Sequence, residues 1–348
     1  MTERGTREDL LDGPRGRRLC WIAVEQHAYA RTGRGPFWDV ISEPEPMLTE
    51  LRRVLRTTDL AEFSTITDDV ALLNFVGESV ATARYWQDPD EEDRALCHPD
   101  FITELQPVAD AIAAAPASAW WPSDLALGDQ VYADWREDGA PPPGLSGAQV
   151  ILREWRRTAV NSMGMWWSPP IWAPALDQAA RMQIPRPMLA QTTRRLRKLG
   201  AVGLLLHEDT DGTANALCRP VRARESLRTF EIKSTKDWIE LVEHYPLDVT
   251  LSREGSWSAA TGLERRWIVP DWCRVAEDYE AVHLTVSGYL SISGRSLLLG
   301  ADTATLVAGW DPDQTYWLAD VLELTGEPTP WEAGDPPKDW RVVADDES

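Results

Sequence analysis

The residues best suited to proton transfer lie close together in the sequence. Asp271 and His283 are side chains that give or take protons, and the hydroxyl of Tyr289 can orient a reacting group. Asp271 stands between Trp267 and Trp272, and a carboxylate among indole rings suits a cationic or sugar ligand. We therefore expect Asp271 and His283 as acid and base candidates, with Tyr289 as an orienting group.

Alternating polar and apolar residues predict a strand over residues 281–292, with His283 and Tyr289 on its polar face. A polar strand face can line a cleft. The same alternation is also typical of a strand whose polar face meets solvent. Asp271, at a predicted helix start, is likewise explained by capping alone. These structural interpretations stay open beside the functional one.

A second candidate site combines indole rings with arginine. Trp166, Trp167 and Trp172 surround prolines that prevent a regular helix, and several arginines follow, among them Arg195. Flat rings beside guanidinium groups suit a nucleobase and its phosphates. An interface between two domains would use the same tryptophans, so both interpretations remain.

Arg228 precedes a predicted strand and is a candidate anion clamp. The strand and the amphipathic helix after it bear a distant likeness to the first strand of ADP-ribosyltransferase folds. The later Ser-Thr-Ser strand and the Glu-x-Glu or Gln-x-Glu turn of those folds are absent from this sequence.

The common enzyme motifs are absent. The sequence has no Walker-type phosphate loop, dinucleotide-binding glycine motif, HExxH zinc motif or GxSxG elbow. Its five histidines are dispersed and its four cysteines lack CxxC spacing, so we expect no metal site and no disulfides. With no cofactor motif, hydrolysis or group transfer fits better than redox chemistry, and the cofactor stays unknown.

Charge and hydropathy exclude further classes. The formal net charge of -21 disfavours general binding to nucleic acid or to an anionic membrane surface. No apolar run reaches 18 residues and the first residues are polar, so we expect a cytoplasmic protein. Eighteen tryptophans exceed ordinary usage, which favours an aromatic-lined ligand surface.

Periodicity predicts an α+β protein in which an N-terminal helical domain precedes an α+β domain with a mostly antiparallel sheet. The expected limits are a flexible N-terminus over 1–16, the helical domain over 17–140, a linker helix and Trp-rich connection over 141–200, the α+β domain over 201–325 and an acidic tail over 326–348.

Several local signals support this division. Ala201–His207 and Ala214–Val221 flank Asp-Thr-Asp-Gly, which predicts a hairpin. Ser234 with Asp237 predicts the start of a helix. Asp88-Pro89-Asp90 predicts another helix start capped by Asp88, and Trp310–Thr315 repeats that Asp-Pro-Asp pattern.

Five segments resemble a family of Trp-rich, uncharacterised actinobacterial proteins, and the resemblance covers most of the chain. The segments are Arg84-Tyr85-Trp86-Gln87, Trp166–Pro170, Arg266–Trp272, Ala281–Leu290 and Gly309–Asp313. The resemblance implies an actinobacterial host and the same pairing of domains, and it implies no activity.

We therefore expect a cytoplasmic protein that binds a small anionic or nucleotide-like ligand in a cleft lined by tryptophan and arginine, with possible group-transfer or hydrolytic activity. The alternative is a noncatalytic immunity or regulatory protein. Its acidic surface would engage a protein partner, with exposed tryptophans as contact anchors.

Overall fold

The computed structural model describes residues 10–33, 44–83, 88–135, 145–161, 189–196, 199–208, 214–334 and 339–343. The helices, including short 3-10 turns labelled η, are α2 (Pro14–Thr32), α3 (Pro44–Leu55), α4 (Ala61–Ser64), α5 (Asp69–Ala81), α6 (Glu91–Leu96), α7 (Pro99–Ala114), η1 (Pro116–Ser118), η2 (Leu127–Asp129), α8 (Ala148–Asn161), η3 (Val202–Leu204), α10 (Thr235–His244), α11 (Thr250–Thr261), α12 (Trp272–Asp278) and α13 (Val286–Ile292). The strands are β1 (Gln130–Asp134), β2 (Gln191–Arg194), β3 (Asn215–Ala223), β4 (Thr229–Ile232), β5 (Pro246–Asp248), β6 (Arg266–Pro270), β7 (Ala281–Leu284), β8 (Leu297–Leu298), β9 (Thr303–Thr305), β10 (Gln314–Trp317), β11 (Leu322–Leu324), β12 (Thr329–Ala333) and β13 (Trp340–Val342).

Two sheets organise the C-terminal part of the chain. The larger sheet has the order β13-β12-β3-β1-β2-β10-β7-β4, with β11 also paired to β3. Its pairs are antiparallel except for β4 and β7, which run parallel. The smaller sheet has the order β5-β6-β9-β8. The expected α+β class with a mostly antiparallel sheet is confirmed.

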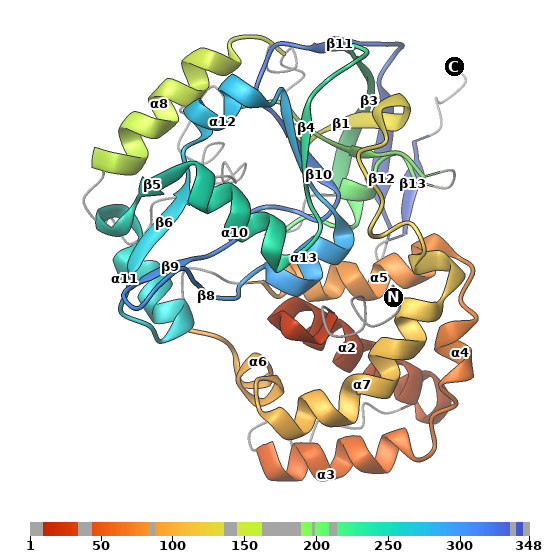
Figure 1. Ribbon diagram of the computed structural model, residues 1–348. Coiled ribbons are helices and arrows are strands. Elements are labelled where there is room, and N and C mark those ends of the chain that lie inside the picture. The colour runs from red at the N-terminus through yellow and green to blue at the C-terminus, as the bar shows by residue number, and fades with distance from the viewer. Residues whose placement is uncertain are drawn as a thin grey trace.

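Helices α2 to α7 lie together on one side of the molecule, as the red to yellow ribbon in Figure 1 shows. One hydrophobic cluster joins this helical part to the larger sheet, because it includes Trp21 of α2, Phe101 of α7 and Leu284 of β7. Within the same cluster Trp310 packs edge to face against Trp238 and against Trp272, and the rings of Trp238 and Trp272 are tilted to each other. The helices and the sheet therefore share a core.

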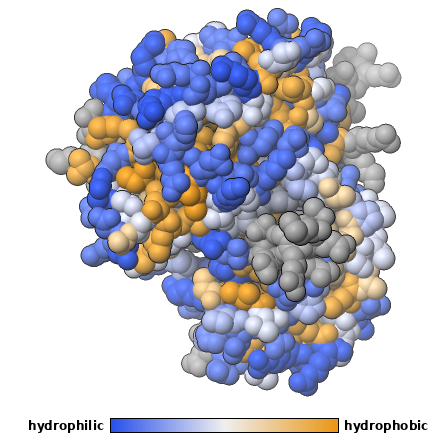
Figure 2. Space-filling view, viewed as in Figure 1, coloured by the Kyte–Doolittle hydropathy of each residue, from blue (hydrophilic) through white to orange (hydrophobic). Residues whose placement is uncertain are grey.

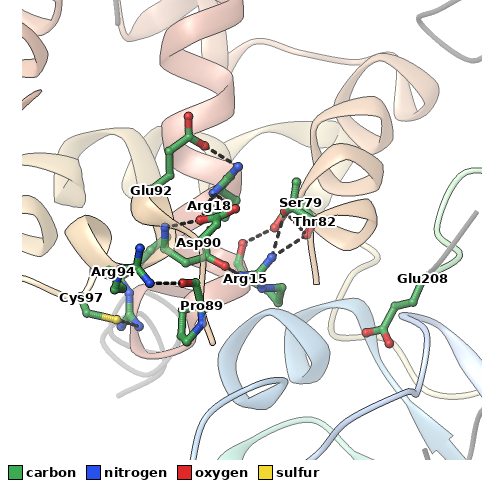
Figure 3. A network of polar contacts seen from close by, with 12 residues as sticks. Arg15, Arg18, Ser79, Thr82, Pro89, Asp90, Glu92, Arg94, Cys97 and Glu208 are labelled. Atoms are coloured by element: carbon green, nitrogen blue, oxygen red, sulfur yellow. Dashed lines mark hydrogen bonds and ion pairs between the residues drawn. The ribbon is translucent and has the colours of Figure 1, made fainter. Parts of the chain in front are cut away.

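A buried ion-pair network fastens α6 to α2 (Figure 3). Arg15 donates to the backbone oxygen of Ser79 and pairs with Asp93. Arg18 pairs with Asp90, Glu92 and Asp93. Asp90 also caps α6 by accepting a hydrogen bond from the Asp93 amide at 2.7 Å. The expected helix start is confirmed, but its cap is Asp90 rather than the exposed Asp88.

Polar and charged side chains cover much of the surface in the view of Figure 2, and apolar side chains gather over the part that holds the smaller sheet. In that sheet Leu298 of β8 has 59% of its surface exposed. No helix among the described residues has the length and apolar character needed to cross a membrane.

The strand predicted over residues 281–292 is wrong beyond Leu284. There β7 ends, and Thr285 caps α13 by accepting a hydrogen bond from the Gly288 amide at 3.0 Å. A Cβ atom on Gly288 would lie 2.4 Å from the carbonyl oxygen of Ile232, so the start of this helix packs directly on β4. Local capping therefore overrides the alternating pattern, and Tyr289 lies on a helix.

Two other local predictions are also wrong. Residues 202–204 form the turn η3, so the predicted hairpin lacks its first strand, although β3 follows at Asn215. Residues 311–314 form a tight turn before β10 instead of starting a helix. Pro312 supplies the ordinary φ of such a turn, and Asp313 follows it with a φ of 57°.

The described elements depart from the expected domain limits in several places. α2 begins at Pro14, inside the expected flexible N-terminus, and Leu10 and Leu11 before it are buried. β2 of the larger sheet lies inside the expected connection over 141–200. β1 lies inside the stretch expected to be helical and pairs with both β2 and β3. The stretch expected to be an acidic tail contributes β12 and β13 to the larger sheet. Trp331 and Trp340 are buried there, and apolar burial explains why an acidic segment joins the sheet.

Candidate functional site

Strand pairing aligns polar side chains on one face of the larger sheet. His283 of β7 lies opposite Glu231 of β4 and opposite Thr315 of β10, and Thr315 lies opposite Thr192 of β2. Directly opposed residues project from the same face. These side chains therefore form one row across four strands.

His283 is held between two carboxylates. Its Nδ1 lies 2.6 Å from Oε2 of Glu231, and its Nε2 lies 3.4 Å from Oδ1 of Asp313. Burial disfavours the charged ring, but the hydrogen bonds to Asp313 and Glu231 outweigh burial and raise the pKa of His283 above its ordinary value. With only 1% of its side chain exposed and a carboxylate beside each ring nitrogen, His283 positions its two partners.

Asp313 is fixed by three contacts. Besides His283, it accepts a hydrogen bond from Arg194 Nε at 2.6 Å and another from the Arg194 amide at 2.8 Å. Its φ of 57° lies in the left-handed region, which costs free energy in a residue other than glycine. The guanidinium carbon of Arg194 lies 4.5 Å from the ring centre of Trp120. These contacts hold an unfavourable backbone conformation at the centre of the network.

The network opens to solvent at Glu231, whose side chain is 19% exposed. The amide of Leu125 donates to Glu231 Oε1 at 3.0 Å, so both carboxylate oxygens have donors. Lys233 pairs with Asp124, and these side chains are 40% and 69% exposed. The hydrogen bond to Asp124 raises the pKa of Lys233. We refer to this set as the Glu231 site: Trp120, Arg194, Glu231, Lys233, His283 and Asp313.

A second histidine lies against the same turn. Nδ1 of His207 lies 2.7 Å from Oδ2 of Asp311, while Oδ1 of Asp311 accepts the Glu208 amide at 2.9 Å. The hydroxyl of Tyr289 donates to Glu208 Oε1 at 2.8 Å. The turn thus places Asp311 against His207 and Asp313 against His283.

The residues that the sequence predicts as catalytic or ligand-binding do not lie together in the structure. Asp271 caps α12 by accepting the Cys273 amide, as the capping interpretation predicts, and it also accepts a hydrogen bond from Arg156 Nε at 2.8 Å. Trp267 is fully buried and packs against Trp257. His283 lies in the Glu231 site, and Tyr289 contacts Glu208.

The arginine candidates lie on the surface. Arg195 is 3.4 Å from Asp129, and Arg228 is 3.0 Å from Glu280. Both arginine side chains are more than half exposed. Trp166, Trp167 and Trp172 lie outside the described residues, so the cleft expected around them stays a prediction.

Sequence reasoning missed most of the Glu231 site. Glu231 lies in a strand that was correctly predicted, but its position beside His283 depends on the parallel pairing of β4 with β7. Asp313 was interpreted as part of a helix start. The sequence does hold a signal for a turn at this point. Pro312 is followed by Asp313, and a proline before a residue that tolerates positive φ is typical of turns.

Among the described residues, no group of three or more His, Cys, Asp or Glu side chains has an arrangement that could hold a metal ion. Comparison of the chain with protein-family models, with curated proteins and with solved structures gave no match. Function is therefore argued from the geometry of the sites alone.

Proposed function

We propose that the protein binds a small anionic or nucleotide-like ligand at the Glu231 site and acts on it by hydrolysis or group transfer. The observation that carries this proposal is the Glu231 carboxylate at the edge of solvent, held by the buried ring of His283. The proposal includes a cytoplasmic location, where the four free cysteines stay reduced.

Glu231 is the proton-transferring group in this proposal. His283 and the Leu125 amide both donate to it, so the carboxylate is held in one orientation. An oriented carboxylate at a solvent boundary suits a general base that activates water or a ligand hydroxyl. His283 is too deeply buried for that task, so its role is positioning.

Lys233 supplies the contact for an anionic group. Its partner Asp124 is largely exposed, and exposed ion pairs contribute little to stability. A ligand phosphate or carboxylate can therefore take the place of Asp124 at small cost. Trp120 and Arg194 supply the aromatic and arginine components that the sequence led us to expect at other positions.

The alternative of a partner-binding protein with tryptophan anchors has less support. Every tryptophan in the described part of the chain is buried or half-buried. The fully buried ones are Trp21, Trp238, Trp267, Trp272, Trp310 and Trp317. Contact anchors need exposed rings. Most of the described tryptophans pack in the core instead.

The test is a titration of the full chain with ATP, AMP and inorganic phosphate. Tryptophan fluorescence and calorimetry measure binding. We expect saturable binding of at least one probe, weakened about tenfold by Lys233→Met because one charge-assisted contact is lost. Lys236→Met is the matched control, since Lys236 is an exposed lysine three residues away, and it should bind normally.

Two further variants separate binding from chemistry. Asp124→Asn should tighten binding by removing the competing carboxylate. Glu231→Gln should retain binding but lose phosphate release from ATP, with folding checked by a thermal melt. Equal binding by the Lys233 and Lys236 variants, or no saturable response to any of the three probes, would exclude the proposal.

A further inference from the structure

A cavity of about 910 Å³ lies on the solvent-facing side of helix α10 and is lined by residues outside the Glu231 site. The opposite side of α10 turns Trp238, Leu241 and Val242 to the core. Cavities that hold small molecules have volumes of roughly 300–1,000 Å³, so this one is large enough for a ligand. Its lining includes Asp12, Thr235, Ile239, Glu240, Glu243 and Arg295.

One end of the cavity is suited to a carboxylate. Helices α10 and α13 lie side by side (Figure 1), and Arg295, which follows α13, reaches the first turn of α10. Its Nη1 lies 3.5 Å from Oγ1 of Thr235 and 3.2 Å from Oδ2 of Asp12. A guanidinium has several donors, so Arg295 can bind a ligand carboxylate while it keeps Asp12. The positive end of the α10 dipole favours an anion at the same place.

The wall at this end is rigid. Arg17 Nη1 donates to the backbone oxygen of Asp12 at 3.0 Å. A Cβ atom on Gly13 would lie 2.1 Å from the carbonyl oxygen of Leu290, so the chain next to Asp12 packs directly on α13. The cavity is therefore formed before a ligand enters, which lowers the entropic cost of binding.

The other end of the cavity is suited to an ammonium group. Glu240 and Glu243 are one turn apart on the same side of α10, near its C-terminal end. The negative end of the helix dipole also favours a cation there. The net charge of -21 attracts cationic groups to the protein as a whole.

The distance between the two ends sets the length of the ligand. Thr235 and Glu243 are about 12 Å apart along the axis of α10, at a rise of about 1.5 Å per residue. Ile239 lies between them and gives the middle of the cavity an apolar surface. An extended chain of three amino acids spans about 10 Å, which matches this distance.

We propose that the cavity is a second binding site, for a peptide of two or three residues with free termini. The peptide carboxylate contacts Arg295 and Thr235, and its amino group contacts Glu240 and Glu243. An apolar side chain of the peptide packs on Ile239. This ligand differs in charge pattern from the anionic ligand of the Glu231 site, so the two sites are independent.

The test is calorimetric titration of the full chain with the peptide glycyl-leucyl-glycine, its N-acetyl form and its C-terminal amide. We expect saturable binding of the free peptide, weakened about tenfold or more by blocking either terminus, because each block removes a charge-assisted contact. Arg295→Met should weaken binding of the free peptide to the same extent and leave binding of the amide unchanged. Joint Glu240→Gln and Glu243→Gln substitution should weaken the free peptide and leave the N-acetyl form unchanged.

The matched controls are Arg222→Met and Glu323→Gln. These two side chains form an ion pair outside the cavity, at 3.8 Å, and are 71% and 72% exposed. Both variants should bind the free peptide normally, and thermal melts confirm that every variant folds. The proposal is overturned if the free peptide shows no saturable binding, if the blocked peptides bind as tightly as the free one, or if the control variants weaken binding equally.

Discussion

At the scale of single residues, the surroundings of His283 determine what this side chain can do. His283 is a proton-transfer residue by type, yet burial keeps it from solvent and two carboxylates hold its ring in place. Removing one partner from such a group leaves the others buried without compensation, which is costly. The residue is therefore more important for stability and for the orientation of Glu231 than for direct chemistry.

The raised pKa of His283 predicts how stability changes with pH. A raised folded pKa gives stabilisation that is fully present below the unfolded value, about 6.5, and is lost as pH rises through the folded pKa. We expect His283→Gln to cost roughly 3–5 kcal/mol at pH 6, because Glu231 loses its partner and Asp313 keeps only Arg194. Urea unfolding of both proteins from pH 6 to pH 10 measures the difference, which should shrink as pH rises. A difference independent of pH would contradict a raised pKa of His283.

At the scale of elements, acidic residues that start helix α6 also hold this helix against α2. Its first turn holds three acidic residues, which favours a helix N-terminus on dipole grounds alone. Two of these acids, Glu92 and Asp93, also pair with Arg18 and Arg15 of α2, which holds α6 against that helix. Local capping and tertiary docking thus use the same side chains.

Because Asp90 both caps α6 and pairs with Arg18, we expect its substitution to destabilise the protein more than substitution of the nearby Asp88. Asp90→Ala loses both the cap and an ion pair with Arg18, and should destabilise the protein by about 1–3 kcal/mol. Asp88→Ala changes an exposed residue and should cost under about 0.5 kcal/mol. Chemical denaturation of the two variants provides the comparison. A larger loss of stability in Asp88→Ala than in Asp90→Ala would show that Asp88 is the cap, as the sequence predicts.

At the scale of the whole molecule, the C-terminal strands complete the sheet. β12 pairs with β3, and β13 pairs with β12, so this edge is formed by the last part of the chain. Trp331 packs closely on Gly200, where an added Cβ would lie 2.4 Å from the indole nitrogen. Stability therefore depends on a segment whose acidic composition suggested a free tail.

Truncation after residue 325 should destabilise the protein strongly. It removes the buried rings of Trp331 and Trp340, and loss of one large buried aromatic costs roughly 3–5 kcal/mol. Truncation after residue 343 is the control, since it removes none of the described strands and should change the melting temperature little. Similar melting temperatures for the two truncated proteins would show that β12 and β13 add nothing to stability.

Local chemistry in the sequence determined part of this structure. The α+β class followed from periodicity, and the caps at Ser234 and Asp271 followed from residue type, because a cap needs only a polar side chain within a few residues of the helix start. The same local information placed Thr285 inside a strand, because the alternation of polar and apolar residues continues past it. In the structure Thr285 caps helix α13 instead, and the strand ends before it.

Only the tertiary structure decided which chemical groups meet. Glu231 reaches His283 because β4 pairs in parallel with β7, and Asp313 reaches His283 because β10 lies on the other side of β7. These pairings join segments about 30 to 50 residues apart, and their register is set by burial of the whole sheet rather than by local preference. Periodicity within one segment holds no information about that register, so the Glu231 site became visible only in the folded chain.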